Sequence, residues 1–164
     1  IYALADSGLR PRLAVSVGSS LEERRRKIIP PAYAAPLGEL EQAVRTYREK
    51  TGRLVSLEYT LVAGLNDTRD EARALASLAR RTGAHVNLIR YNPAGREGLA
   101  YPAAAKMEEF RKLLAGAGVE VTERYRRGTD IRAACGQLVY HAPPPPDRAV
   151  SASYHPSASP ARHQ

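Results

Sequence analysis

The sequence predicts an α/β fold in which short parallel strands alternate with helices. Four short apolar runs, at residues 13–17, 55–61, 86–89 and 119–122, are typical of strands. Each run is rich in leucine or β-branched residues and is bounded by glycine, proline or polar residues. Helical patterns lie between the runs, and one strand with its helix takes about 30 to 40 residues, as in βαβ units.

Start and stop residues bound the helices that we expect between these strands. A capping-box sequence, Thr68 followed by Glu71, begins a helix that ends at Gly83. Gly52 ends an earlier helix, in which apolar residues recur every three or four positions. Pro102 suits the first turn of a later helix. The helices are therefore expected over residues 37–51, 69–82 and 102–116.

Four such units are too few to close an eight-stranded barrel. The chain is therefore either a small open α/β domain or the C-terminal part of a larger barrel or partial barrel. In both folds the chemistry collects at the C-terminal ends of the strands. The loops that follow the strands are consequently the places to search for a site.

Composition narrows the class of partner. The 164 residues carry a formal net charge of +8 at pH 7, which favours a polyanionic partner such as RNA. The alternative explanation is a proteome that uses arginine wherever lysine would serve. One cysteine cannot make an internal disulfide, so we expect a cytoplasmic protein. No apolar run approaches the roughly 20 residues of a membrane-spanning helix, so no membrane partner is expected.

The two ends of the chain differ from its middle. Ile1 rather than methionine opens the sequence, and we therefore treat the chain as a fragment of a longer protein. Residues 142–164 are rich in proline, serine and alanine, and contain too little apolar surface to offset the entropy lost on ordering. We accordingly expect a folded part over residues 1–141 and a disordered tail over residues 142–164.

The loop after the first strand is one candidate site. Ser16-Val17-Gly18, followed by Ser19 and Ser20, places a glycine among small hydroxyl residues. Such a loop lets backbone amides approach a ligand's carboxylate or phosphate. The alternative is an ordinary connection in which one of the last two serines caps a short helix that begins near residue 21.

The second and third strands supply further polar candidates. Asn92, which precedes Pro93 after the third strand, can hold the polar part of a cofactor because an amide both donates and accepts; the alternative is a turn. Asn66 and Asp67 follow the second strand and are explained by turn chemistry alone. Glu58 within that strand is either a buried site carboxylate or an exposed or tyrosine-bonded side chain.

Cys135, the only cysteine, has the small neighbours Ala134 and Gly136, which leave its thiol reachable by a bulky partner. The alternative is an ordinary buried cysteine. The basic run at residues 124–127, just upstream, suits phosphate contact and base stacking, or else forms a solvated edge. A second basic run, residues 24–27, follows two glutamates and is interpreted as a solvent-exposed helix face with salt bridges.

Taken in order, these segments resemble the C-terminal part of the RlmN/Cfr family of radical S-adenosylmethionine (SAM) enzymes. The resemblance covers roughly residues 10–140, and its most specific part is Asp130-Ile131-Arg132-Ala133-Ala134-Cys135-Gly136-Gln137-Leu138. It also rests on residues 13–17, 58–61, 64–67, 86–89, 92–93 and 128–129. The fold that it implies is the C-terminal portion of a radical SAM partial (βα) barrel with parallel strands.

The resemblance also implies an activity. Members of this family methylate an adenine of 23S rRNA, and one branch also methylates tRNA, using SAM, a [4Fe-4S] cluster and an electron donor. Cys135 matches the methyl-carrying cysteine: one SAM methylates its thiol, and a radical formed from a second SAM activates that methyl group for addition to the adenine ring. Asn92 and Ser16-Val17-Gly18 match SAM contacts, although Gly18 replaces the family's usual histidine.

The family's Cys-x-x-x-Cys-x-x-Cys cluster motif cannot exist in a chain with one cysteine. We expect that motif, and a second catalytic cysteine, N-terminal to these residues. Three hypotheses follow: the C-terminal part of a working, monomeric methyltransferase, a degenerate relative that binds RNA without chemistry, and an unrelated α/β metabolic enzyme. Within the first, methylation of adenine C2 is preferred over C8, because C2 methylation is the family's commoner housekeeping activity.

Overall fold

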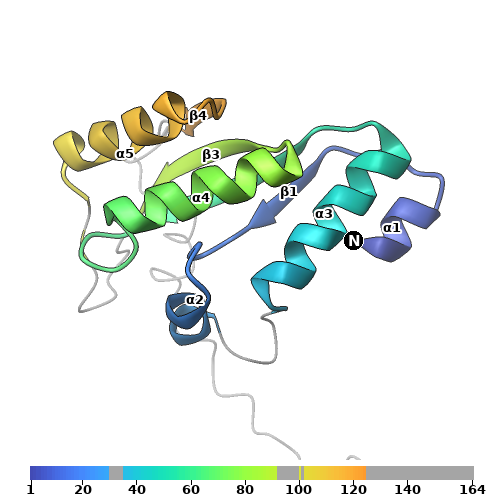
Figure 1. The fold of residues 1–164 in the computed structure, drawn as a ribbon, viewed down its shortest axis with the longest axis horizontal. Coiled ribbons are helices and arrows are strands. Elements are labelled where there is room, and N and C mark those ends of the chain that lie inside the picture. The colour runs from blue at the N-terminus through green and yellow to red at the C-terminus, as the bar shows by residue number, and fades with distance from the viewer. Residues whose placement is uncertain (30–34, 92–99, 101, 125–164) are drawn as a thin grey trace, which may run out of the picture.

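The computed structural model describes residues 1–29, 35–91, 100 and 102–124 (Figure 1). The helices in these ranges are α1 Tyr2–Asp6, α2 Glu22–Ile28, α3 Leu37–Thr51, α4 Arg69–Thr82 and α5 Ala104–Gly116. The strands are β1 Leu13–Ser16, β2 Val55–Leu61, β3 His85–Arg90 and β4 Val121–Arg124. None of the helices described is both long and apolar enough to cross a membrane.

All four strands are parallel and lie in one sheet in chain order, β1-β2-β3-β4. Helices α2 and α3 connect the first two strands, α4 the next pair and α5 the last. Figure 1 shows α3, α4 and α5 side by side along the sheet. In a doubly wound sheet the strand order reverses and helices cover both faces, whereas in a barrel wall the strands follow one another in one direction. The order β1-β2-β3-β4 has no reversal, as in a barrel wall. The predicted α/β partial-barrel architecture is confirmed.

The element boundaries differ from the expected ones in several places. β1 ends at Ser16 rather than at residue 17, and β3 extends over His85–Arg90 rather than 86–89. Helix α5 begins at Ala104, so Pro102 precedes the helix instead of occupying its first turn. The fourth strand begins at Val121 rather than at residue 119, because Val119 belongs to the turn that ends α5. Its N–H donates to the Leu114 carbonyl at 3.1 Å, and its side chain is buried. Helix α1 was not expected from the sequence, since only one of its five residues, Ala5, is buried and no apolar stripe marks it.

The core lies between the sheet and the three long helices. Side chains along β2 alternate strictly between buried and half-buried positions, as they must when only one face of a strand is covered by helices. Tyr59 of β2 stacks on Phe110 of α5 with ring centroids 5.5 Å apart, which joins the middle of the sheet to the last helix. The fully buried core residues of the strands are Val55, Leu57, Tyr59, Leu61, Val86 and Leu88.

The C-terminal ends of α3 and α4 contact each other at Gly83. This glycine ends α4 in the left-handed conformation, with φ 60°, which residues with a Cβ atom rarely adopt. The guanidinium of Arg48, from α3, lies across it and donates to the Thr82 carbonyl at 2.8 Å. A Cβ atom built on Gly83 would lie 1.6 Å from Nη1 of Arg48. A larger residue at this position would adopt a strained backbone and displace the Arg48 guanidinium from the end of α4.

We predict that Gly83→Ala lowers the free energy of unfolding by about 1–2 kcal/mol, the typical cost of a left-handed L residue. Gly116→Ala is the matched control, because a Cβ atom there meets nothing within 4 Å. We expect it to be neutral or stabilising by up to about 1 kcal/mol, since alanine is the better helix former. Urea unfolding measures both variants, and equal losses would contradict the prediction.

Candidate functional site

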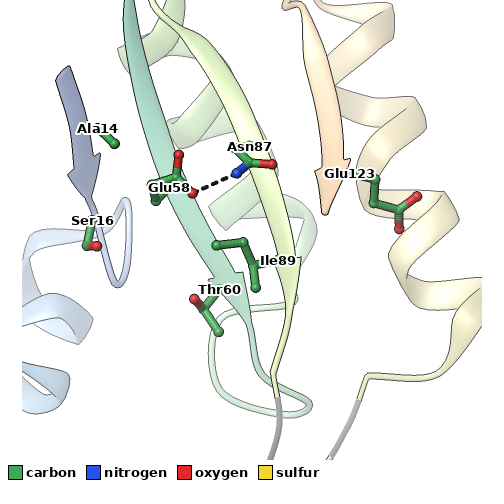
Figure 2. Close-up of a pocket in the computed structure, with 7 residues that line it drawn as sticks. All are labelled: Ala14, Ser16, Glu58, Thr60, Asn87, Ile89 and Glu123. Atoms are coloured by element: carbon green, nitrogen blue, oxygen red, sulfur yellow. Dashed lines mark hydrogen bonds between the residues drawn. The ribbon is translucent and has the colours of Figure 1, made fainter. Parts of the chain in front are cut away.

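The face of the sheet that points away from the core borders an open hollow of about 620 Å³ (Figure 2). Its lining comes from all four strands: Ala14, Ser16, Glu58, Thr60, Asn87, Ile89 and Glu123. Glu123 lies in register with Leu88 of the core face, and Figure 2 shows its side chain directed away from the others. The polar groups that face the hollow are therefore those of β1, β2 and β3.

A chain of hydrogen bonds runs across this face from β2 to β4. The Glu58 carboxylate accepts from the Ser56 hydroxyl at 2.6 Å and from Nδ2 of Asn87 at 2.7 Å. The amide oxygen of Asn87 in turn accepts from the Thr122 hydroxyl at 3.2 Å. Glu58 is thus a half-buried carboxylate, oriented on both sides and facing the hollow. The neighbouring Tyr59 does not bond to it, because that side chain points into the core and donates to Glu71.

Ser16 lies at the C-terminal end of β1, in register with Glu58 on β2. Its side chain is exposed beside the hollow (Figure 2). Among the residues that the structure describes, its hydroxyl has no hydrogen-bond partner. Ser16 therefore places a hydroxyl at the strand edge where parallel α/β folds bind ligands.

Val17 differs from Ser16 because it is fully buried. Its N–H donates to the Glu58 carbonyl at 3.0 Å, and its carbonyl accepts from Nε of Arg25 at 3.0 Å and from the Ser19 N–H at 2.9 Å. Both backbone polar groups of Val17 are therefore occupied within the protein. Its contact with SAM stays a prediction.

Gly18 has a left-handed backbone, with φ 73°. A Cβ atom there would lie 2.9 Å from Cδ1 of Ile29, so a larger residue is strained and also displaces a neighbour. This packing gives a physical reason for glycine where the family resemblance implies histidine. The Gly18 carbonyl accepts from Nδ2 of Asn66 at 2.8 Å, while its N–H has no partner within the described ranges.

Asn66, interpreted from the sequence as a turn residue, is a buried connection between two loops. It is 1% exposed. Its Nδ2 donates to the carbonyls of Gly18 and Thr60, each at 2.8 Å, and its Oδ1 accepts from the Val62 N–H at 2.8 Å. Sequence reasoning missed this role because an asparagine after glycine has the same turn signature whether its amide points inward or outward.

Glu71, in the first turn of α4, is fully buried beneath the same loop. Its carboxylate accepts from the Ser19 and Ser20 hydroxyls at 2.5 Å each, from the Ser20 N–H at 2.8 Å and from the Tyr59 hydroxyl at 2.9 Å. Arg24 approaches the carboxylate at 3.4 Å. Burial first, and then the charge of Glu71, raise the pKa of Tyr59, so this hydroxyl keeps its proton and acts as a donor.

This arrangement corrects two expectations about capping. Neither Ser19 nor Ser20 caps α2, because Leu21 is the residue before that helix and makes no side-chain cap. Only half of the predicted capping box forms. The Thr68 hydroxyl accepts from the Glu71 N–H at 3.3 Å, but the Glu71 side chain reaches the two serines instead of returning to Thr68.

The interpretation of residues 24–27 as a solvent-exposed helix face is wrong for Arg25. Its side chain is buried, and it donates to the carbonyls of Val17 and Ala35 at 3.0 and 2.5 Å. Arg26 does form the expected surface pair with Glu22, at 3.1 Å. The basic run therefore serves partly to hold the loop after β1.

Cys135 and Asn92 lie outside the described residues, as do residues 125–127 and the expected tail, 142–164. The described backbone reaches the residue before Asn92: the Tyr91 N–H donates to the Leu61 carbonyl at 3.0 Å, at the C-terminal end of β2. Over the ranges that the structure covers, no group of three or more histidine, cysteine or acidic residues lies close enough to hold a metal ion.

Curated proteins that are similar to this chain include RNA methyltransferases. A probable dual-specificity RNA methyltransferase RlmN from a strain of Thermus thermophilus is 45% identical over 145 residues, which are 88% of this chain and 41% of the relative. The probable RlmN 3 of Opitutus terrae is 44% identical over 84% of this chain and 37% of its own length. The chain thus spans about two fifths of the curated relatives that it matches. No protein-family model matches it.

Solved structures agree. A radical SAM methyltransferase from Sphaerobacter thermophilus superimposes with a TM-score of 0.77 at 39% identity, over 82% of this chain and 40% of that one. A domain of a pyruvate-formate lyase-activating enzyme from Bacteroides vulgatus shares the fold alone, with a TM-score of 0.55 at 15% identity, over 69% of this chain and 66% of that domain. The singly wound sheet and these likenesses define the class as a radical SAM-type α/β fold. Within that class, the chain belongs to the RlmN/Cfr family.

Asn66→Ala tests the connection between the two loops. It removes three hydrogen bonds, one buried, to the Val62 N–H, and two half-buried, to the carbonyls of Gly18 and Thr60. We expect the free energy of unfolding to fall by about 3 kcal/mol, since unsatisfied buried groups cost about 1–3 kcal/mol each. Asp67→Ala, which loses a single exposed bond to the Gly64 N–H, is the matched control and should cost under about 1 kcal/mol. Chemical denaturation distinguishes them; similar costs would show that Asn66 does not hold the loops.

Proposed function

We propose that this chain is part of a radical SAM RNA methyltransferase that methylates adenine C2 in 23S rRNA and also acts on tRNA. The observation that carries the proposal is the 45% identity, over 88% of the chain, to a relative named as a dual-specificity RNA methyltransferase. The net charge of +8 suits an RNA substrate. Since the chain spans 41% of that relative, the complete reaction needs residues beyond these.

The described residues fit SAM, which supplies a methyl group when bound. The hollow of about 620 Å³ falls within the usual size of a cofactor pocket. Its rim offers the Ser16 hydroxyl, the nearby Gly18 N–H and the oriented carboxylate of Glu58. These donors and this acceptor complement the carboxylate, ammonium and hydroxyl groups of SAM. We assign SAM contacts to Ser16, Val17, Gly18 and Asn92, as the family resemblance implies.

These residues do not fit a [4Fe-4S] cluster. Such clusters are held by several cysteine thiolates, and the chain has one cysteine. Cluster ligands and the second catalytic cysteine would have to come from residues outside this chain.

We assign to Cys135 the role of methyl carrier. In this role its thiolate would attack the methyl carbon of SAM: a carbon–sulfur bond forms at Cys135 while the methyl–sulfonium bond breaks, and S-adenosylhomocysteine leaves. The later transfer of this carbon to adenine would need a radical and electrons supplied from outside these residues. Its small sequence neighbours, Ala134 and Gly136, favour a sulfur that both partners can reach. Residues 1–141 belong to the catalytic part and residues 142–164 form a tail. The protein acts as a cytoplasmic monomer that takes electrons from a separate donor.

A second candidate function is RNA binding without chemistry. It is favoured by Gly18 in place of histidine. It shares the RNA partner with the first function and differs from it in whether Cys135 ever carries a methyl group.

Methylated-nucleoside analysis of rRNA and tRNA from a deletion strain tests the activity. We expect 2-methyladenosine to disappear and to return when the wild-type gene is restored. Loss of 8-methyladenosine instead would assign the C8 reaction. Unchanged nucleosides in both RNAs would overturn the proposed enzyme and favour the RNA-binding alternative.

Cys135→Ala, introduced into the same strain, tests the methyl carrier. The variant should fail to restore the modified adenine, while Glu49→Gln, at an exposed position of α3, restores it. Peptide mass spectrometry of the wild-type full-length protein should find one additional methyl group on the peptide that contains Cys135. Full methylation by the alanine variant would exclude a catalytic role for this cysteine.

Ser16→Ala tests the proposed SAM contact. Loss of one hydrogen bond should raise the Kd for SAM about three- to tenfold. Ser77→Ala, on the exposed side of α4, is the control and should leave the Kd unchanged. Calorimetric titration of the full-length protein with SAM provides the measurement. An unchanged Kd in the Ser16 variant would remove this residue from the site without affecting the proposed reaction.

A further inference from the structure

The loop after β1 is held by side chains from three other places in the fold. Arg25 of α2 binds the Val17 carbonyl, Asn66 binds the Gly18 carbonyl, and Glu71 of α4 binds Ser19 and Ser20. Two groups beside these anchors stay unpaired among the described residues, namely the Ser16 hydroxyl and the Gly18 N–H. The three side chains therefore hold the loop in place and leave free the two groups to which we assign SAM contacts.

Glu71 is the anchor with the strictest chemical requirement. All the groups around its carboxylate are donors: two serine hydroxyls, one serine N–H, the Tyr59 hydroxyl and the Arg24 guanidinium. An ionised carboxylate accepts on both oxygens, so it can satisfy all of them. A glutamine of the same shape would turn an NH₂ group toward donors on one side. The pocket is thus built for a negative charge, which is costly to bury without such partners.

The partners of Glu71 divide into a loop side and a core side. Ser19 and Ser20 belong to the loop that follows Ser16, whereas Tyr59 belongs to β2 and stacks on Phe110 in the core. If Glu71 only stabilised the fold, removing a loop-side partner and removing a core-side partner would have similar effects on ligand binding. If Glu71 positions the loop, only the removal of a loop-side partner should weaken ligand binding.

We propose that Glu71 is a positioning residue for SAM: by anchoring Ser19 and Ser20, it holds the Ser16 hydroxyl and the Gly18 N–H in the arrangement that the cofactor meets. Glu71 itself is fully buried and does not line the hollow, so it acts through the loop. The inference rests on the proposed function, because it requires that the full-length protein bind SAM at this edge of the sheet.

The experiment compares SAM affinity among variants of the full-length protein by calorimetric titration, with thermal unfolding measured in parallel. Glu71→Gln should raise the Kd for SAM by on the order of tenfold, the effect of losing a hydrogen bond to a charged group. Ser19→Ala, which removes one loop-side donor and spares the carboxylate, should raise the Kd in the same direction. Ser19→Ala also keeps the test decisive if the glutamine variant does not fold.

Tyr59→Phe is the control for the core side. It removes one donor to the same carboxylate, together with the 3.0 Å bond from that hydroxyl to the Asn66 backbone carbonyl, and leaves the Asn66 side chain and both serines in place. It should lower the melting temperature and leave the Kd for SAM unchanged. Leu114→Ala, a core variant in α5, controls for general destabilisation and should also leave the Kd unchanged below its melting temperature.

The outcomes separate the two proposals. Wild-type protein that does not bind SAM would overturn the proposed function itself. Wild-type binding, combined with unchanged Kd values in Glu71→Gln and Ser19→Ala, would overturn the positioning role alone. A Kd that rises equally in Tyr59→Phe and Leu114→Ala would show that Glu71 contributes stability and nothing specific to the loop.

Discussion

The carboxylate of Glu71 is the point at which the sheet, two helices and the loop after β1 meet. Burying a charged group costs several kcal/mol even after the protein relaxes around it, and only a full set of donors offsets that cost. Here the donors come from β2, from α2 and from the two serines that follow the first strand. The position of α4 against the sheet and the course of that loop are consequently linked through one group.

The candidate site depends on that link because its parts come from separate strands. Ser16 lies at the end of β1, while Glu58 and Asn87 lie on β2 and β3. Hydrogen bonds orient the latter two within the sheet, but Ser16 is followed by a loop that β2 holds only at its first residue, through the bond from the Val17 N–H to the Glu58 carbonyl. Side chains from α2, α4 and the loop after β2 supply the missing support. A cofactor would therefore meet a surface that is already arranged, which reduces the ordering entropy lost on binding.

The strands and the three long helices could be predicted from the sequence because their signals are local: short β-branched runs, three- and four-residue spacing of apolar side chains, and glycine at helix ends. The burial of Glu71 also had a signal, since it lies on the same helical stripe as Leu75 and Leu78. The partners that stabilise the buried carboxylate could not be predicted, because Ser19 and Ser20 are about fifty positions away in the sequence. Likewise, Arg25 and Arg26 look alike in sequence, and only the path of the chain after α2 buries one of them. The roles of Cys135 and Asn92 came from resemblance to a family, since spacing alone favoured ordinary explanations.

The hydrogen bonds that join Glu58, Asn87 and Thr122 have a consequence for how the strands align. Side chains alternate along a strand, so a slip of one residue would turn Glu58 into the core and bring Leu57 or Tyr59 to the open face. Apolar burial opposes such a slip in any sheet, but here the polar side opposes it as well, because the three partners meet only in one alignment. Strand register is therefore specified from both faces of the sheet. A ligand in the hollow would contact a pattern of polar groups that misaligned strands cannot reproduce.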